Sequence, residues 1–301
     1  SKCVKCMRCI QICEKVQSLG VWDLQGTGHR TTVGVVDNLD LQDGDCSLCG
    51  QCITHCPVGA LRSRDDRDIL NDAIDDPEKI IIAQVAPAVR TAWGEQIGLR
   101  DEESTMGKLV CALKKIGIDY VFDTTYSADL TIMEEGSEFL ERLAHKEDYS
   151  WPMFTSCCPG WVRFVKTQYP DMVKNLSTAK SPQQMFGAVV REYYKDPEKN
   201  EGKKIVSVSI MPRTVFSLSI MPCVAKKYER SVPQVNDSGK GSDVDLVLTT
   251  RELDSFIRSD NIRPEDLVDM PFDSIFGEGS GAGVIFGTTG GVMEAALRTA
   301  Y

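Results

Sequence analysis

The sequence contains no apolar run of the roughly 18 residues that a membrane-spanning helix needs. Its longest apolar stretch, IIIAQVAPAV at residues 80–89, has about the length of a strand. A secretion signal is absent as well, although the chain begins two residues before a cysteine and looks trimmed, so a targeting segment could have been lost. We therefore expect no membrane span and a cytoplasmic location, with a periplasmic or organellar one left open.

A block of lysine and arginine is also missing. The 301 residues hold 34 Lys and Arg against 44 Asp and Glu, which gives a net charge of −10. Because nucleic-acid phosphates bind to a basic face, we expect no nucleic-acid partner and interpret the negative charge as a source of solubility. The remaining composition is ordinary for a soluble globular protein, and the length suggests about two domains.

Cysteine, in contrast, is abundant and unevenly spread. Eight of the 12 cysteines fall within the first 56 residues, at short and regular spacings. That regularity argues against a set of disulfides and predicts metal ligation. So many free thiols suit a reducing or anoxic setting.

The spacing C-x2-C-x2-C-x3-C occurs twice, in CVKCMRCIQIC and in CSLCGQCITHC. It is typical of bacterial ferredoxins, in which three cysteines of a run hold one iron–sulfur cube and the fourth ligates the other. Zinc prefers two pairs of cysteines, so two tandem runs fit zinc poorly. His55, inside the second run, is interpreted as a surface residue. The spacing predicts two 4Fe–4S clusters, one on Cys3, Cys6, Cys9 and Cys56 and the other on Cys13, Cys46, Cys49 and Cys52.

Residues 1–66 are therefore interpreted as a ferredoxin-like α+β domain, with a β-hairpin at 20–36 around a Gly-Thr-Gly turn. A charged helical connector follows at 67–78. From 79 to 301 strands alternate with helices, which predicts an α/β domain of twisted, mostly parallel sheets covered by helices. The expected strands are 79–87, 119–126, 151–156, 204–212, 214–222 and 244–249, and helices are expected at 106–116, 128–146, 160–169, 181–194 and 250–259 and at the end of the chain.

Four cysteines lie in this second part. Cys111 is on the apolar face of KLVCALKKIG and is interpreted as a buried structural thiol. Cys157 and Cys158 are adjacent, in TSCCPGW, where a strand is expected to end and a helix to begin, and ligand sites of α/β folds collect at such points. Cys223 also follows a strand. Lys226 lies one turn beyond it, which is the setting that an anionic cofactor would need.

Glu135, Glu138 and Arg142 are spaced by three and four residues, which places them on one stripe of the helix expected at 128–146. Taken alone, such a stripe is typical of a solvated, salt-bridged helix face. The alternative is a proton relay, because a buried metal site needs titratable groups a hydrogen bond apart.

The segments TSCCPGW (155–161) and MPCVAKKYE (221–229) resemble the first two signature motifs of the FeFe-hydrogenases. SPQQMFGA, TIMEEGSEF, APAVR and FGTTGGVMEAALR fit the same family, so the resemblance runs from Cys3 to Tyr301. It implies a ferredoxin-like domain that feeds a catalytic domain of two twisted, helix-covered sheets. It also implies the reaction 2H⁺ + 2e⁻ ⇌ H2 at an H-cluster, a 4Fe–4S cube bridged through a cysteine to a di-iron unit with carbonyl, cyanide and azadithiolate ligands.

The resemblance also assigns roles by position. Cys158 and Cys223 correspond to ligands of the H-cluster cube, whereas Cys157 corresponds to a thiol that exchanges a proton with the azadithiolate amine. Lys226 corresponds to a residue that hydrogen-bonds a cyanide ligand. The proton path outward would run through Glu135, Ser177, Glu138 and Arg142, and the cofactor pocket would be lined by Pro87, Met221 and Phe286.

Two features depart from the family pattern. A third motif, with two further cysteines that complete the cube and bridge to the di-iron unit, does not occur before Tyr301. Three explanations stay open: a chain that is incomplete at its C-terminus, a partner chain that supplies the ligands, and an inactive relative. In addition, SVSIMP at 207–212 nearly repeats SLSIMP at 217–222, and only the second copy leads into Cys223.

These observations favour a catalytic subunit of an FeFe-hydrogenase. A non-catalytic relative that senses H2 or assembles iron–sulfur clusters is one alternative, and a pure electron-transfer module is another. The expected partners are H2, protons and a ferredoxin or another redox protein. The segment CEKVQSLGVW resembles longer members of the family, some of which work with further hydrogenase subunits that use NAD.

Overall fold

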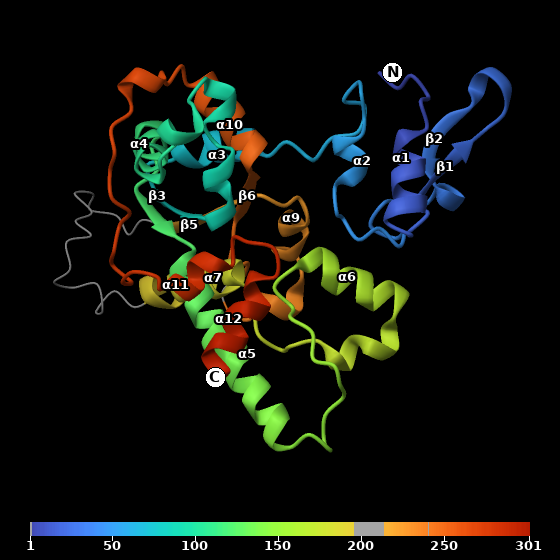
Figure 1. Cartoon of the computed structure of the whole chain (residues 1–301). Coiled ribbons are helices and arrows are strands. Elements are labelled where there is room, and N and C mark those ends of the chain that lie inside the picture. The colour runs from blue at the N-terminus through green and yellow to red at the C-terminus, as the bar shows by residue number, and fades with distance from the viewer. Residues whose placement is uncertain (1, 196–213, 240) are drawn as a thin grey trace.

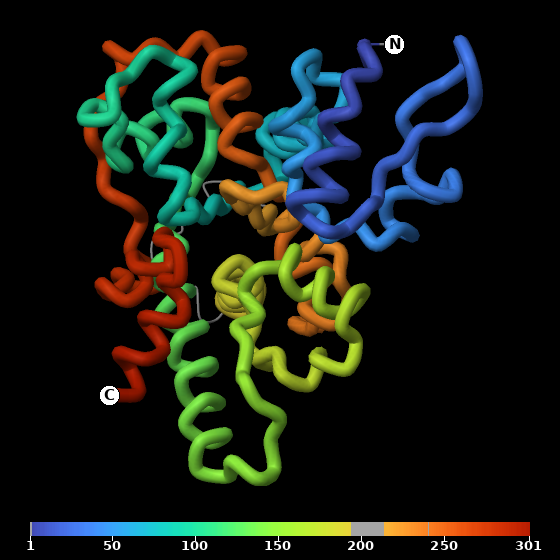
Figure 2. The backbone as a smooth tube through the Cα atoms, turned by 45° about the vertical axis from the view of Figure 1, so that its right-hand side comes forward, coloured from blue at the N-terminus to red at the C-terminus, as the bar shows by residue number. Residues whose placement is uncertain are grey.

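The computed structural model describes residues 2–195, 214–239 and 241–301, and Figure 1 shows their arrangement. A small N-terminal part, in blue, lies beside a larger body that contains a helix-covered sheet. Figure 2 shows from a second direction that this part lies next to body segments coloured orange and yellow-green. Within the described residues no helix is long and apolar enough to cross a membrane.

The N-terminal part is built from short elements around the two cysteine runs. Each run leads into a helix, α1 (Arg8–Gln11) or α2 (Gln51–Thr54), and a π-helical turn at Ile12–Val16 continues α1. Between the runs, β1 (Trp22–Gln25) pairs antiparallel with β2 (Thr32–Val35), which confirms the predicted hairpin. Short 3-10 turns lie at Gly28–Arg30 and Val36–Asn38.

The two cysteine runs share one backbone geometry. The residue two positions after the first cysteine is left-handed in both runs, with φ 56° at Lys5 and 58° at Leu48. The residue one position after the second cysteine is left-handed too, with φ 63° at Met7 and 76° at Gly50. Left-handed residues other than glycine are uncommon, so their repetition at equivalent positions shows that the two loops bend in the same way.

The body contains a four-stranded sheet in the order β4-β3-β5-β6, and all neighbouring strands are parallel. The strands are β3 (Lys79–Val85), β4 (Tyr120–Asp123), β5 (Thr214–Met221) and β6 (Leu246–Thr249). The predicted α/β architecture is confirmed, and the described residues of the body hold one such sheet. Because parallel strands end at a common edge, the segments that follow β3 and β5, with Pro87 and Cys223, lie at the same edge.

The sheet is buried on both faces, and alternate residues of β3 serve opposite faces. Ile81 and Val85 belong to the larger hydrophobic core, and Ile80 and Ile82 to a smaller one with Phe186. This two-sided burial explains the continuous apolar run of the strand. The larger core is covered by α3 (Arg67–Ile74), α4 (Met106–Ile116) and α10 (Thr250–Ser259), and the smaller one by α7 (Pro182–Lys195).

Several helix ends follow from the sequence. The Thr105 hydroxyl caps α4 by accepting from the Lys108 N–H at 3.2 Å, and Gly117, left-handed at φ 112°, ends the helix at the predicted residue, Ile116. Thr249 and Glu252 form a capping box at the start of α10. The remaining helices are α5 (Thr125–Ala144), α6 (Pro159–Gln168), α9 (Ala225–Glu229), α11 (Gly281–Ile285) and α12 (Gly291–Ala300), with 3-10 turns at Pro87–Thr91, Glu95–Ile97, Asp101–Glu103, Pro170–Asn175, Pro233–Val235 and Pro264–Asp266.

Two predicted strands need correction. Residues 151–156 form no strand: Phe154 makes an isolated bridge to Leu176, because Pro152 has no N–H with which to extend a ladder. The strand predicted at 119–126 ends at Asp123, whose carboxylate accepts from the Thr125 N–H at 2.9 Å, and α5 begins there. The strand expected at 204–212, with the first copy of the near-repeat, lies outside the described residues.

Candidate functional site

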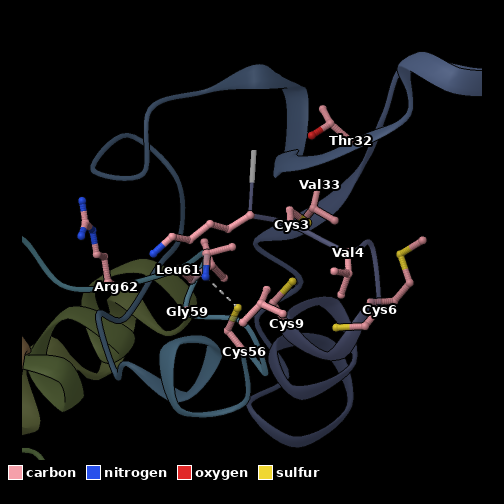
Figure 3. A pocket seen from close by; sticks show the side chains of 14 residues that line it. Cys3, Val4, Cys6, Cys9, Thr32, Val33, Cys56, Gly59, Leu61 and Arg62 are labelled. Carbon is pink, nitrogen blue, oxygen red and sulfur yellow. Dashed lines mark hydrogen bonds between the residues drawn. The ribbon is translucent and has the colours of Figure 1, made fainter.

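The first group of N-terminal thiols surrounds a cavity of about 330 Å³ (Figure 3). Cys3, Cys6 and Cys9 of the first run line it together with Cys56, the last cysteine of the second run. Backbone N–H groups point at the sulfurs: Lys5 N donates to Cys3 Sγ at 3.4 Å and Ala60 N to Cys56 Sγ at 3.2 Å. These four thiols are the set that the sequence predicts for one cluster.

The second group joins Cys13 to the first three cysteines of the second run. Burial raises the pKa of Cys52 to about 11, with Cys46, Cys49 and Cys13 adding to the rise and the Trp22 side chain opposing it. The N–H···S bonds are repeated here, from Leu48 N to Cys46 Sγ and from Val21 N to Cys13 Sγ, both at 3.4 Å. The structure therefore brings these four thiols together as well.

Both groups fit a 4Fe–4S cube. Each combines three cysteines of one run with one from the other, on a bent loop with N–H groups aimed at sulfur. Burial raises the pKa of Cys9 and Cys46 as well, so bare thiolates are disfavoured at these positions, whereas backbone N–H groups, of Leu61 above all, lower the pKa of Cys56. Bound iron would supply the positive charge that a buried thiolate lacks. Over the described ranges, no three His, Cys, Asp or Glu side chains meet closely enough to hold a single metal ion.

The cysteines of the body meet where α6 and α9 begin. Cys158 is the residue before α6 and is exposed, whereas Cys223 follows β5 and is half-buried. Burial raises the pKa of Cys223. The Ala225 N–H and Lys226 oppose the rise and Cys158 adds to it, so the two thiols are neighbours. Cys111 is buried in the core, as predicted, and His55 is exposed.

Cys157 differs from its neighbour in its surroundings. Burial raises the pKa of its thiol to about 11; Lys226 opposes the rise, and Glu135, Cys158 and Glu229 add to it. At neutral pH the group is therefore a protonated thiol, with Lys226, Glu135 and Glu229 as the charged groups that act on it.

Lys226 is held by a buried polar network that the sequence did not predict. Its Nζ donates to the Cys157 carbonyl oxygen at 2.8 Å and to Glu229 Oε2 at 2.9 Å. Gln183 Nε2 donates to the same Glu229 oxygen at 3.1 Å, and Gln84 Nε2 donates to the Gln183 carbonyl oxygen at 3.0 Å. Two features of the sequence could have indicated this network. Gln84 is a polar residue inside an apolar strand, and Glu229 lies one turn after Lys226.

The helix stripe of α5 is not a solvated face. Arg142 is 3% exposed, and its Nε and Nη2 donate to Glu138 Oε1 at 3.0 and 2.5 Å. The other oxygen, Glu138 Oε2, accepts from the Ser177 hydroxyl at 2.7 Å and from the Thr178 N–H at 2.9 Å. Glu138, Ser177 and Arg142 thus form one connected hydrogen-bonded group.

Glu135 continues this group toward Cys157. It is 2% exposed, and neither carboxylate oxygen has a hydrogen-bond partner among the described residues. Burial raises its pKa to about 7; the Ser177 hydroxyl and the Ser156 backbone oppose the rise, and Glu138 adds to it. Since Glu135 also influences the pKa of Cys157, it lies near both Cys157 and Ser177.

The residues predicted for the cofactor pocket lie at the carboxyl edge of the sheet. Pro87 and Met221 are buried, and the Ala86 N–H donates to the Ile220 carbonyl oxygen at 3.0 Å, which places the two strand ends side by side. Phe286 directly follows α11 and is half-buried. A Cβ on the next residue, Gly287, would lie 3.1 Å from Pro87 Cβ, so the Phe286 segment reaches this edge.

The second cysteine run is in contact with the body beside its cysteines. A Cβ on Gly160, two residues after Cys158, would lie 3.0 Å from the Ser47 carbonyl oxygen. A Cβ on Gly50 would lie 2.9 Å from Val224 Cγ2, next to Cys223. The thiol group of Cys13, Cys46, Cys49 and Cys52 is therefore the one nearest to the body thiols, and we call it the near group.

Two family models match the chain. Residues 79–301 match the iron only hydrogenase large subunit, C-terminal domain, and residues 2–60 match the 4Fe-4S dicluster domain. The second match agrees with the two thiol groups described above. The N-terminal residues thus form a two-cluster iron–sulfur domain.

Similar proteins include hydrogenases. The chain is 46% identical to the NADP-reducing hydrogenase subunit HndD of Solidesulfovibrio fructosivorans and 42% identical to iron hydrogenase 1 of Clostridium pasteurianum, each over 100% of this chain. It spans 50% of the length of each. A more distant relative, 28% identical over 85% of the chain, is the cytosolic iron-sulfur assembly component 3 of Bos taurus.

Solved structures agree in fold. A structure solved to study oxygen inactivation of an FeFe-hydrogenase superimposes with a TM-score of 0.65 at 41% identity, over 79% of this chain and 57% of the other. The apo FeFe-hydrogenase HydA1 of Chlamydomonas reinhardtii gives a TM-score of 0.61 at 42% identity, over 77% of this chain and 57% of that one.

Proposed function

The chain belongs to the iron-only (FeFe) hydrogenase family, and on that premise we propose that it is part of a catalytic subunit that interconverts H2 with protons and electrons. The observation that supports this proposal is that two groups of residues lie beside Cys157 and Cys158. The loop of the near group contacts the body next to Cys158 and Cys223, and Glu135 lies near Cys157 on the helix that carries Glu138, the acceptor of the Ser177 hydroxyl.

The electron route follows from the positions of the two N-terminal thiol groups relative to the cysteines of the body. The group of Cys3, Cys6, Cys9 and Cys56 lines a cavity away from the body cysteines, and we propose that its cluster is the far one. The near group contacts the body at Gly160 and Val224. Electrons would thus pass from a redox partner to the far cluster, then to the near cluster, and then to the site at Cys158 and Cys223.

The cofactor that fits this site is the H-cluster, which when bound supplies the metal centre at which protons and electrons combine. Cys158 and Cys223 would hold its cube from the ends of α6 and β5. Lys226, fixed by Glu229 and the Cys157 carbonyl oxygen, would present an ammonium group to an anionic ligand. The apolar side chains of Pro87, Met221 and Phe286 would line its pocket and exclude water.

The proton route uses the chain's own titratable groups. Cys157 would hold a proton on Sγ, and Glu135, whose pKa of about 7 allows both states near neutral pH, would take and return it. The Ser177 hydroxyl would connect Glu135 with Glu138 Oε2, and the Arg142 guanidinium would orient Glu138 and stabilise its charge. The relay runs along one face of α5.

The domain limits, partners and location belong to this proposal too. We propose domains at 1–66 and 79–301 joined by a connector at 67–78. A ferredoxin or a subunit that uses a nicotinamide cofactor would donate or accept the electrons; the name of one relative, the NADP-reducing hydrogenase subunit, supports the second of these. The cytoplasm, a reducing compartment, suits a chain with so many free thiols.

One test distinguishes a hydrogenase from the two alternatives, an iron–sulfur assembly protein and an electron carrier. The full-length protein, matured with its cofactor, should evolve H2 from a reduced dye and show infrared bands of metal-bound carbon monoxide and cyanide. An iron–sulfur assembly relative would show neither, and a pure electron carrier would contain about eight iron atoms, the content of two cubes. A fully iron-loaded protein without these bands would contradict the proposal.

A further inference from the structure

Arg163 connects the loop of the second cysteine run with segments of the body, and both parts carry predicted iron ligands. It lies on α6, and its Nε donates to the Cys46 carbonyl oxygen at 2.6 Å. Its Nη2 donates to the carbonyl oxygens of Gln42 at 2.6 Å and Gly44 at 3.2 Å. One side chain of the body therefore holds three backbone groups of the loop that enters the second cysteine run.

The same guanidinium reaches the segment after Cys223. It lies over the ring of Tyr228 on α9, with 5.0 Å between the guanidinium carbon and the ring centroid. α6 begins directly after Cys158, and α9 begins two residues after Cys223. Arg163 is thus in contact with the near-group loop and with α9, while it is itself part of the helix that Cys158 precedes.

The chemistry of these contacts requires arginine. A planar guanidinium offers five N–H donors in a fixed fork and can stack on a ring while it donates in its own plane, whereas a lysine ammonium is a point donor. The hydrogen-bond partners are neutral carbonyl oxygens rather than carboxylates, so they do not cancel the positive charge. That charge lies against Cys46, a predicted ligand of the near cluster.

We propose that Arg163 is a positioning residue that fixes the near cluster against the Cys158–Cys223 site and, through its charge, raises the reduction potential of that cluster. The inference rests on the electron route proposed above. A reduced cluster carries one more negative charge than the oxidised one, and a nearby cation stabilises the reduced form. An electron would therefore be drawn from the far cluster to the near one.

The test compares three variants of the cluster-loaded full-length protein. Arg163→Lys keeps the charge and loses the fork, Arg163→Gln loses both, and Lys166→Gln removes one charge from an exposed position on the same helix. The rate of backbone hydrogen exchange at residues 42–49 reports how strongly Arg163 stabilises the loop. Redox titration followed by electron paramagnetic resonance reports the potential of each cluster.

We expect several-fold faster exchange of residues 42–49 in both Arg163 variants, and parent-like exchange in Lys166→Gln. The near cluster should become harder to reduce in Arg163→Gln and stay close to the parent in Arg163→Lys, while the far cluster changes little. Parent-like exchange in both Arg163 variants would overturn the positioning role. An unchanged near cluster in Arg163→Gln, or an equal shift in Lys166→Gln, would overturn the electrostatic role.

Neither readout depends on H2 turnover. If the protein evolves no H2 but the loop and the near-cluster potential respond as expected, the proposed function fails and the role of Arg163 stands. If H2 is evolved but neither the loop exchange nor the near-cluster potential responds, the proposed role of Arg163 fails and the proposed function stands. Should Arg163→Gln fail to fold, hydrogen exchange of the loop in Arg163→Lys still decides the positioning role. The electrostatic role then requires that the near-cluster potential of Arg163→Lys stay close to that of the parent.

Discussion

At the scale of single residues, the most informative group is a carboxyl without a partner. Glu135 is buried, and neither of its oxygens accepts a hydrogen bond from a described residue. A buried polar group of this kind costs stability, and burial therefore raises its pKa, to about 7. Perturbed carboxyls of this type cluster at functional sites, where a group that is half-protonated near neutral pH can pass protons.

Glu135→Gln should stabilise the protein, and more so as the pH rises. Below the unfolded pKa of 4.5, Glu135 is protonated in both states and contributes no pH dependence. Between 4.5 and about 7 the folded state binds more protons than the unfolded state, so stability falls, and above about 7 the loss is complete. The loss amounts to about 3 kcal/mol, which glutamine avoids. Urea denaturation of the parent and the variant at pH 5 and pH 8 measures it.

The matched control is Glu134→Gln, which removes an exposed carboxyl from the preceding position of α5. Its effect on the free energy of unfolding should be small and nearly the same at both pH values. If Glu135→Gln gives no larger gain at pH 8 than at pH 5, Glu135 is not held with a raised pKa.

The two adjacent cysteines should respond differently to serine. Cys157→Ser should leave the iron content unchanged and remove most H2 turnover, because a hydroxyl does not replace the proton-donating thiol. Cys158→Ser should lower the iron content of the body site, because it removes a proposed ligand. Iron analysis and dye-linked H2 evolution measure the two effects.

Cys111→Ala controls for the loss of a thiol, since Cys111 is buried in the core away from the site. It should keep both iron content and turnover. Equal iron loss in Cys157→Ser and Cys158→Ser would argue against the separate roles proposed for the two thiols.

At the scale of elements, helix ends were predictable where one residue decides them. Gly117 ends α4 in the left-handed conformation, and Thr249 begins α10 as its cap. The segment at 151–156, whose pairing depends on one distant residue, was not predicted correctly. Residues 151–156 have the apolar composition of a strand, yet their single bridge partner is Leu176. Local pattern sets the tendency of a segment, and the neighbour that pairs with it comes from elsewhere in the fold.

Gly117→Ala should destabilise the body. The residue has φ 112°, and a Cβ there would lie 2.9 Å from Ile74 Cγ2 of α3. The left-handed conformation alone costs an alanine about 1–2 kcal/mol. The midpoint of thermal unfolding should therefore fall by a few degrees.

Gly281→Ala is the control for this substitution, because a Cβ at Gly281 meets no atom within 4 Å. Its midpoint should stay close to that of the parent. Equal midpoints for the two variants would show that Gly117 does not need its backbone freedom.

At the scale of the whole molecule, the sequence predicted which cysteines group together as ligands. It did not predict which other side chains contact them. Regular spacing brought the eight N-terminal cysteines into two groups, because a short loop forces its own cysteines together. The network of Gln84, Gln183 and Glu229 was missed, since its members come from separate elements that only the folded sheet brings together. The same holds for Arg163, which lies 117 positions from Cys46.

Iron removal should unfold the N-terminal part before the body. Among the described residues up to 60, the buried apolar side chains are Cys13 and Val21, whereas the body has an extended core. A part with so little apolar burial depends on its metal for folding. After chelation, hydrogen exchange should become fast for residues 2–60 and stay slow for β3 and α4. Slow exchange throughout both parts would contradict this.

Met7 and Gly50 occupy equivalent bends in two loops of the same shape. The first bend tolerates a long side chain, so the backbone conformation alone does not require glycine. At the second bend a Cβ would come within 2.9 Å of Val224. The absence of a side chain at Gly50 therefore leaves room for Val224, and the second cysteine loop can lie directly against the segment that follows Cys223.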